Sequence, residues 1–225
     1  MEKIHHKGVA GYAPTAVAGF LLALVFTFNG CGGSKTAVSN TGSTVTNNLP
    51  RINVEQGTYG DEIYKTVVIG TQTWMAKNLN YNAAGSVCYD NDPANCEKYG
   101  RLYNWATAMA LPSGCNTISC SEQIGTKHQG VCPKGWHLPS NEEWDILVRH
   151  VNGISEDKFG FSALLGGYGD SSGSFSKVGS YGSWWSTFEY DSAYSYHQIM
   201  DYNGTYSDYY AYDKSHLFSV RCVRD

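Results

Sequence analysis

The sequence predicts an α+β domain stabilised by disulfides, preceded by an export signal and a polar tether. Three observations predict it: helical patterns lie in the middle of the chain with strand patterns at both ends, six cysteines follow residue 80, and 14% of the 225 residues are aromatic. This aromatic content excludes a disordered chain. The formal net charge of −4 disfavours nucleic acid as a partner, because such binding relies on a basic surface.

The first thirty residues have the pattern of a signal peptide. Two lysines precede the apolar run 16–28, which is shorter than the roughly 20 residues that a membrane-spanning helix needs. The run leads to Gly30-Cys31, which resembles the lipobox of bacterial lipoproteins. That resemblance implies that residues 1–30 are removed and that lipidation occurs at Cys31. The alternative is an ordinary secretory signal, which would leave Cys31 as a free thiol.

The segment after the signal predicts a tether. Residues 31–57 are rich in Ser, Thr, Asn and Gly and show no hydrophobic period, so the domain is expected to span residues 58–225. Without residues 1–30 the chain keeps 14 basic and 19 acidic residues, which disfavours attraction to an anionic membrane face. We therefore expect the lipid to be the membrane anchor, in the bacterial cell envelope and specifically the outer membrane.

Six cysteines predict a disulfide framework in the exported domain: Cys88, Cys96, Cys115, Cys120, Cys132 and Cys222. Fifteen pairings are open. The simplest joins near neighbours and leaves a long-range Cys132–Cys222 bridge. Zinc is the competing interpretation, but the cysteine spacings lack a Cys-x2-Cys knuckle and no histidine pair sits at ligand spacing, so no metal is predicted.

The first half of the domain contains a strand pattern and a helix pattern. Residues 62–69 and 73–77 are rich in Val, Ile, Thr and Trp and flank Gly70-Thr71, which predicts an opening hairpin. Residues 103–111 have a helical composition and end before a proline. We expect one helix there.

The clearest predicted helix begins at Ser140. Glu143 follows three residues later, so the two side chains form a capping box. Apolar residues then recur at helical spacing and predict a face turned to the core: Trp144, Leu147, Val148 and Val151.

The last third of the chain is rich in strand patterns. Residues 196–202 and 205–212 flank Asn203-Gly204, a strong hairpin signal because both turn positions need a positive φ. Residues 218–224 alternate apolar and polar side chains and predict a single final strand. We expect this strand to pair with the opening one.

Six ordered motifs carry a resemblance to a known family: Gly70–Leu79, Tyr99–Trp105, Gly130–Pro139, Gly160–Leu164, Trp184–Ser186 and Ser219–Val223. Together they resemble the Fibrobacter succinogenes major paralogous domain, a family of exported bacterial lipoproteins, from about residue 58 onward. A more distant likeness is to C-type-lectin-like folds, including formylglycine-generating enzymes. It rests on residues 137–144 and implies a C-type-lectin-like domain with paired terminal strands and a Cys132–Cys222 disulfide.

The sequence does not predict an enzyme or a cofactor. It has neither a Gly-x-Ser-x-Gly elbow nor a phosphate-binding loop. Formylglycine-generating enzymes use two late cysteines, whereas Cys222 is the only cysteine here after Cys132. Glu143 is occupied as a cap. Calcium is an alternative at residues 90–92, which are more typical of a polar turn.

Aromatic density predicts a binding surface. Ten of the seventeen tyrosines lie in residues 168–212, and tyrosine offers an apolar face with a polar tip. The candidate ligand-binding residues are Trp184, Trp185, Tyr202, Tyr206, Tyr209 and Tyr210. The alternative is that the two tryptophans belong to the core and that alternate tyrosines fill the buried face of the sheet. We therefore expect a non-catalytic surface module that binds a polysaccharide or an envelope protein. The alternative is a structural coat protein.

Overall fold

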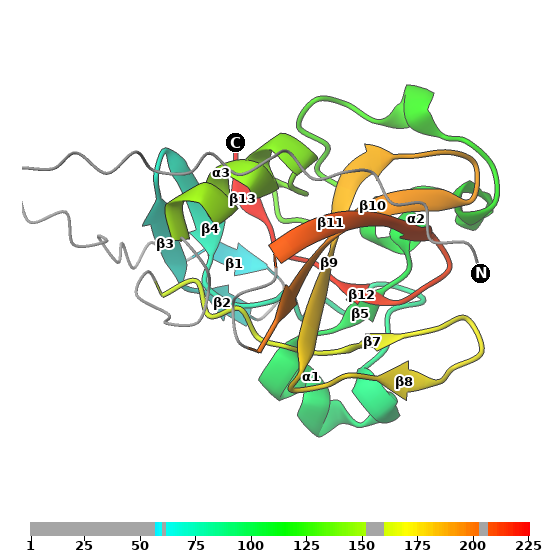
Figure 1. Cartoon of the computed structure of the whole chain (residues 1–225), viewed down its shortest axis with the longest axis horizontal. Helices are drawn as coiled ribbons and strands as arrows, with labels where there is room; N and C mark the ends of the chain where they lie inside the picture. Colours follow the sequence, from blue (N-terminus) through cyan, green and yellow to red (C-terminus); the bar gives the residue numbers. More distant parts are fainter. Residues whose placement is uncertain (1–56, 60–61, 152–159, 203–206) are drawn as a thin grey trace, which may run out of the picture. The chain divides into compact units, whose positions relative to one another are not determined.

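The structure, a computed structural model, describes residues 57–59, 62–151, 160–202 and 207–225 (Figure 1). The predicted signal, the lipidation site Cys31, nearly all of the predicted tether and the Asn203-Gly204 turn lie outside these residues. Within them, no helix is long and apolar enough to cross a membrane.

The described chain combines short helices with two larger sheets. The helices are α1 (Pro93–Tyr99), α2 (Trp105–Ala108) and α3 (Asn141–Val151), with 3-10 turns at Tyr89–Asn91, Ser113–Asn116 and Ser121–Gln123. The strands are β1 (Gly57–Tyr59), β2 (Glu62–Tyr64), β3 (Thr66–Ile69), β4 (Gln72–Met75), β5 (Leu102–Tyr103), β6 (Trp136–His137), β7 (Tyr168–Gly169), β8 (Phe175–Ser176), β9 (Tyr181–Glu189), β10 (Tyr194–Asp201), β11 (Ser207–Asp213), β12 (Phe218–Ser219) and β13 (Val223–Arg224). This confirms the α+β class.

A five-stranded sheet has the order β11-β10-β9-β12-β5, and a four-stranded sheet has the order β3-β4-β13-β6. Strand β12 runs parallel to β9 and antiparallel to β5. The last strand, β13, pairs with β4 through Val223 and Trp74, so a strand from the end of the chain lies beside the opening hairpin, as predicted (Figure 1). The remaining pairs, β1–β2 and β7–β8, form separate hairpins.

The opening hairpin forms at the predicted turn. Strands β3 and β4 pair antiparallel and Gly70 adopts a φ of 59° between them. A Cβ at this position would lie 2.6 Å from the His150 ring, so glycine is needed for space as well as for its backbone. The predicted strand 62–69 is divided in two at Lys65, however, because β2 pairs with β1 whereas β3 pairs with β4.

The predicted helix 103–111 is shorter than expected. Tyr103 belongs to β5, and the Asn104 side chain caps α2 by accepting a hydrogen bond from the Thr107 amide at 2.9 Å. The helix ends before Ala110, whose φ of 52° is incompatible with a continuing right-handed helix. The helix therefore starts at Trp105, directly after its Asn104 cap, and not at Tyr103 as predicted.

Helix α3 confirms the predicted capping box and core face. The Glu143 carboxylate accepts from the Ser140 amide at 2.9 Å, while the Glu143 amide donates to Ser140 Oγ at 3.3 Å. Trp144 and Leu147 are buried. The Trp144 ring lies 5.0 Å from Trp74 and 6.1 Å from Trp184, so the helix packs against both larger sheets.

The prediction of one final strand over residues 218–224 is wrong. Strands β12 and β13 belong to different sheets, and the residues that join them cross the core. Arg221 is 0% exposed there. Its guanidinium donates to Asn78 Oδ1 at 2.6 Å and to the carbonyls of Met75 and Ser162, so its donors are satisfied inside the protein. The alternation of apolar and polar residues over 218–224 does not reveal that the chain passes from one sheet to the other, because the side chains on both faces of this segment are buried.

Three disulfides join Cys88 to Cys96, Cys115 to Cys120 and Cys132 to Cys222. This confirms the simplest of the fifteen pairings. The third bridge spans 90 residues and ties the segment before α3 to the end of the chain. Disulfides are typical of proteins outside the cytoplasm, so this framework indicates an extracytoplasmic domain.

Candidate binding surface

Trp184 and Trp185 lie in the core, which corrects the prediction that they bind a ligand. Both are 0% exposed. Trp184 Nε1 donates to Asn78 Oδ1 at 2.8 Å, and Trp185 Nε1 donates to the Tyr103 carbonyl at 2.7 Å. Successive residues of a strand face opposite sides of its sheet, and a separate apolar cluster covers each side of β9 here. Neither ring can stack against a ligand at the surface.

The four predicted tyrosines have different environments. Tyr202 is 67% exposed at the end of β10, and Tyr209 is 39% exposed on β11. Tyr210 is half-buried and pairs with His197, on the other face of the sheet from Tyr209. Tyr206 lies outside the described residues. Of the described three, Tyr209 is the one that joins an exposed cluster of rings.

This cluster consists of Phe188, Tyr190, Tyr196 and Tyr209, and we call it the aromatic patch. Tyr196 is the central ring. Its centroid lies 5.4 Å from Phe188, 5.7 Å from Tyr190 and 5.5 Å from Tyr209. Phe188 is 52% exposed and Tyr190 is 38% exposed. Burial and the neighbouring tyrosines Tyr190 and Tyr209 raise the pKa of Tyr196 above its ordinary value.

Strand alternation and register assemble the patch. Phe188 and Tyr190 flank Glu189 at the end of β9, so both turn away from the side that Glu189 faces. The next strand, β10, supplies Tyr196. In the β10–β11 register Gln198 is opposite Tyr209, which makes Tyr196 a diagonal neighbour of Tyr209.

Sequence reasoning missed Phe188, Tyr190 and Tyr196. The alternation of Phe188 and Tyr190 around a carboxylate was a usable signal for two rings on one side of a strand. The contacts of Tyr196 with rings on β9 and β11 could not be inferred from the sequence. They depend on the pairing register, which shifts between Ser195 and His197.

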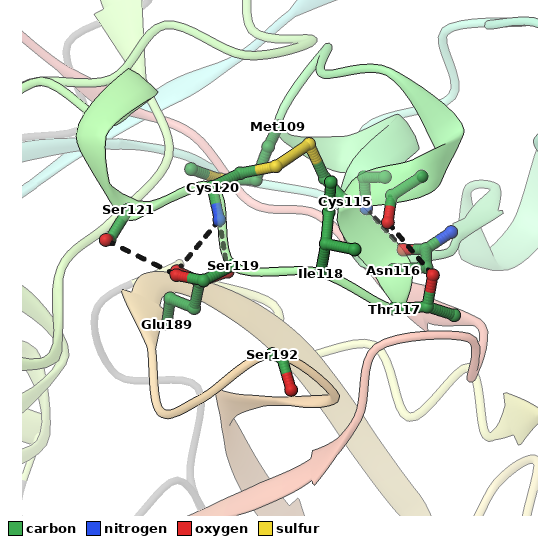
Figure 2. The surroundings of a disulfide bond; sticks show 12 residues. Met109, Cys115, Asn116, Thr117, Ile118, Ser119, Cys120, Ser121, Glu189 and Ser192 are labelled. Carbon is green, nitrogen blue, oxygen red and sulfur yellow. Dashed lines mark hydrogen bonds between the residues drawn. A yellow bond between two sulfur atoms is a disulfide. The ribbon is translucent and has the colours of Figure 1, made fainter.

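A buried ion pair lies between the aromatic residues on β9 and the Cys115–Cys120 loop. Lys214 Nζ contacts the Glu189 carboxylate, and the two side chains are 0% and 3% exposed. Figure 2 shows that Glu189 also reaches the loop, where it accepts hydrogen bonds from Ser119 Oγ at 2.7 Å and from the Cys120 amide at 2.9 Å. The pair therefore fixes the end of β9 to the disulfide loop.

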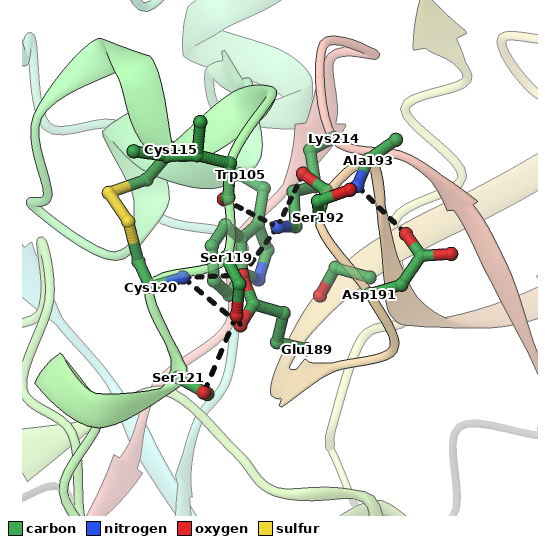
Figure 3. A network of polar contacts seen from close by, with 12 residues as sticks. Trp105, Cys115, Ser119, Cys120, Ser121, Glu189, Asp191, Ser192, Ala193 and Lys214 are labelled. Carbon is green, nitrogen blue, oxygen red and sulfur yellow. Dashed lines mark hydrogen bonds and ion pairs between the residues drawn. A yellow bond between two sulfur atoms is a disulfide. The ribbon is translucent and has the colours of Figure 1, made fainter.

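The surroundings of Lys214 satisfy its ammonium group. The Nζ atom donates to the Ser192 carbonyl at 3.1 Å and lies 4.6 Å from the Trp105 ring centroid (Figure 3). Burial raises the pKa of Glu189, but the hydrogen bonds from Lys214, Cys120 and Ser119 outweigh burial and lower it overall. Glu189 is therefore an ionised anchor directly below the aromatic patch.

His137 contacts two carboxylates, which the sequence did not predict. Its Nε2 lies 2.8 Å from Glu143 Oε1 and its Nδ1 lies 2.7 Å from Asp225 Oδ1. Burial lowers the pKa of His137, but the two carboxylates outweigh burial and raise it. Because Glu143 also caps α3, this contact joins β6, α3 and the end of β13.

The pKa of buried His197 is shifted in the opposite direction to that of His137. Burial lowers its pKa to about 3, so the ring is neutral. The ring lies 4.4 Å from Phe218 and 6.3 Å from Trp185, and it acts as part of the core.

The other candidate chemical groups have structural roles. All six cysteines of the described chain form disulfides. At the predicted polar turn, Asp92 caps α1 by accepting from the Ala94 amide at 2.9 Å. Over the described ranges, no cluster of three or more His, Cys, Asp or Glu residues is arranged to hold a metal ion.

A cavity of about 520 Å³ lies beside the opening hairpin. It is lined mainly by apolar groups of β2, β3 and residues 160–164, together with Lys65 and Lys77. It does not include a residue of the aromatic patch.

Comparison with known families gave one match, in the first part of the described region. Residues 67–159 match the model of the Fibrobacter succinogenes major domain. This segment is therefore similar to that domain over less than half of the chain. It includes β4, nearly all of β3, the described helices α1, α2 and α3, and five of the six cysteines of the disulfide framework. A comparison with curated proteins gave no match. The aromatic patch lies beyond residue 159, so the match to the Fibrobacter succinogenes major domain does not include it.

Proposed function

We propose that the protein is a non-catalytic surface module that binds a polysaccharide or another envelope protein through the aromatic patch. The observation that carries this proposal is the chain of ring contacts that joins exposed Phe188 and exposed Tyr209 through the half-buried ring of Tyr196. Exposed apolar residues that are scattered singly need no explanation, but a contiguous patch is typical of an interaction site.

The rigidity of the patch supports this proposal. Tyr196 is paired with Ala211 of β11, and its neighbours Ser195 and His197 are paired with β9, so the backbone that carries Tyr196 is held from both sides. The Glu189–Lys214 pair fixes the end of β9 in the same way. A preformed surface loses little conformational entropy on binding, and tyrosine has few rotatable bonds to order.

We infer further that the domain has a C-type-lectin-like fold. The pairing of β4 with β13 and the Cys132–Cys222 bridge support this inference. A fold by itself does not carry a function, so the proposal of binding rests on the patch. An experimental structure with a different strand order around β13 would contradict the inference.

We also propose that Cys31 carries a lipid that anchors the chain in the outer membrane. The apolar run that leads to Gly30-Cys31 supports it, together with the extracytoplasmic disulfides. Labelled palmitate is expected to enter the native chain and not the Cys31→Ser variant. Equal labelling of both chains would refute lipidation at this residue.

Binding assays with the full chain test the main proposal. We expect the chain to sediment with isolated cell envelope or with an insoluble polysaccharide, and the double variant Tyr190→Ser/Tyr209→Ser to lose at least tenfold in affinity. Tyr202→Ser is the matched control, because Tyr202 is exposed but lies outside the patch. Its affinity is expected to stay within twofold of native.

The outcomes separate the alternatives. Equal binding by the native chain and the double variant would exclude the patch as the binding surface. An envelope that retains the protein only through its lipid, with no patch dependence, would favour a structural coat. Turnover of a substrate by the purified chain would contradict the proposal that it is not an enzyme.

A further inference from the structure

The strands that form the aromatic patch carry acidic residues and no basic ones. From Val178 to Asp213 the sequence has five carboxylates and neither lysine nor arginine. Glu189 is neutralised by Lys214 in the interior. The other four carboxylates belong to Asp191, Asp201, Asp208 and Asp213, so the charge of this region of the surface is negative.

Two of these carboxylates have positions beside the patch. Asp191 directly follows Tyr190 and is held in the β9–β10 turn, where its Oδ1 accepts from the amides of Ala193 and Tyr194 at 2.8 Å. Asp213 is the cross-strand partner of Tyr194 and is on the same face of β11 as Tyr209. Both negative charges are therefore fixed by backbone structure near the rings.

The angles between the rings limit what the patch can bind. The plane of Tyr196 makes angles of 60° with Phe188, 88° with Tyr190 and 79° with Tyr209. Rings that stack together on a flat sugar chain need similar orientations, and the central ring shares its orientation with none of these neighbours. A ridged surface of this kind fits side chains that insert between rings.

We propose that the partner of the aromatic patch is a protein segment rich in arginine. The planar guanidinium group stacks on aromatic faces and also forms paired hydrogen bonds with carboxylates, so it fits a surface that combines tyrosines with aspartates. Charge complementarity selects against acidic partners, because like charges brought together at an interface weaken binding. This inference rests on the proposed function and specifies its ligand class.

A labelled peptide of six arginines separated by Gly-Ser is the probe, with six-lysine and six-glutamate peptides of the same design for comparison. Anisotropy with the full chain is expected to show binding in the order arginine, lysine, glutamate. Tyr190→Ser/Tyr209→Ser is expected to weaken the arginine peptide at least tenfold, and Asp191→Asn severalfold. Tyr190→Phe, which keeps the ring, is expected to bind like the native chain.

Two control variants match these changes outside the patch. Tyr202→Ser removes an exposed tyrosine, and Asp90→Asn removes an exposed carboxylate at a position whose φ of 54° asparagine adopts readily. Both are expected to bind the arginine peptide within twofold of native. Equal losses in the control and patch variants would show that binding does not depend on the aromatic patch and would overturn the proposal.

Cellohexaose and an insoluble glucan provide the test of the other ligand class. If they bind in a patch-dependent way and the arginine peptide does not, the arginine proposal is overturned while the proposed function stands. If patch variants bind the arginine peptide and the cell envelope as tightly as the native chain, both proposals fail. Patch-dependent binding of the arginine peptide with no glucan binding supports both.

Discussion

Lys214 shows how a single charged residue can be part of the interior. Its side chain has no exposed surface, yet it contacts the Glu189 carboxylate, two backbone carbonyls and the Trp105 ring. A buried ion pair stabilises a fold little compared with an apolar pair of similar size, but removal of one partner leaves an uncompensated charge. Loss of Lys214 alone is therefore expected to destabilise the fold more than replacement of the whole ion pair by apolar residues.

Lys214→Met is expected to lower the free energy of unfolding by about 3–5 kcal/mol, because the Glu189 carboxylate would stay buried without its cation. Guanidinium unfolding with the disulfides intact measures this. Lys214→Met/Glu189→Leu is expected to lose much less than the single variant. Lys134→Met is the control, since Lys134 is exposed. A single variant as stable as this control would contradict the assignment.

At the scale of elements, His137 joins three of them. Strand β6 carries the residue, the first turn of α3 supplies Glu143, and Asp225 follows β13. Helix α3 itself follows from sequence, because its cap and its apolar face are local patterns. The position of His137 between two carboxylates does not follow from local patterns in the same way, because Asp225 comes from the far end of the chain.

The raised pKa of His137 predicts a pH dependence of stability. The carboxylates stabilise the protonated ring, so their contribution is full below the unfolded-state pKa of about 6.5 and is lost as the pH rises through the higher pKa of the folded state. The difference in unfolding free energy between the native chain and His137→Gln is therefore expected to shrink above pH 6.5. Urea titrations between pH 5 and 9 measure it.

His150→Gln is the control for this titration, because His150 is exposed at the end of α3 and contacts the Ile146 carbonyl of its own helix. The His137→Gln difference is compared with the His150→Gln difference at each pH. A His137→Gln difference that stays constant or grows above pH 6.5 would show that the two carboxylates do not hold a proton on this ring.

At the scale of the whole molecule, the Cys132–Cys222 bridge joins the middle of the chain to its end. It closes a loop of about 90 residues, whereas the other two bridges close loops of fewer than ten. A longer loop removes more freedom from the unfolded chain. This bridge and the β4–β13 pairing hold the end of the chain against the four-stranded sheet.

Cys132→Ala/Cys222→Ala is expected to lower the free energy of unfolding by about 4–5 kcal/mol, and Cys115→Ala/Cys120→Ala by about 2 kcal/mol, from the dependence of chain entropy on loop length. Guanidinium unfolding of both paired variants checks the order. A larger loss for the Cys115–Cys120 pair would show that the ties between its loop and Glu189 matter more than loop length.

The sequence alone determined the features that depend on near neighbours. The Gly70 turn, the capping box of α3 and the strand patterns of β10 and β11 are set by residues a few positions apart, so they could be read directly. The sequence also predicted that the cysteines form disulfides, and the simplest of the fifteen open pairings is the one observed.

The tertiary structure alone decided which aromatic and charged residues are buried. Trp184 and Trp185 are consecutive in the sequence and were candidate binding residues. Both are buried, because other elements cover both sides of β9. Arg221 and Lys214 look like surface charges, but their partners are distant in the chain. The aromatic patch forms because the register of three strands brings Tyr196 to its neighbours, and register is fixed by the packing of the whole sheet.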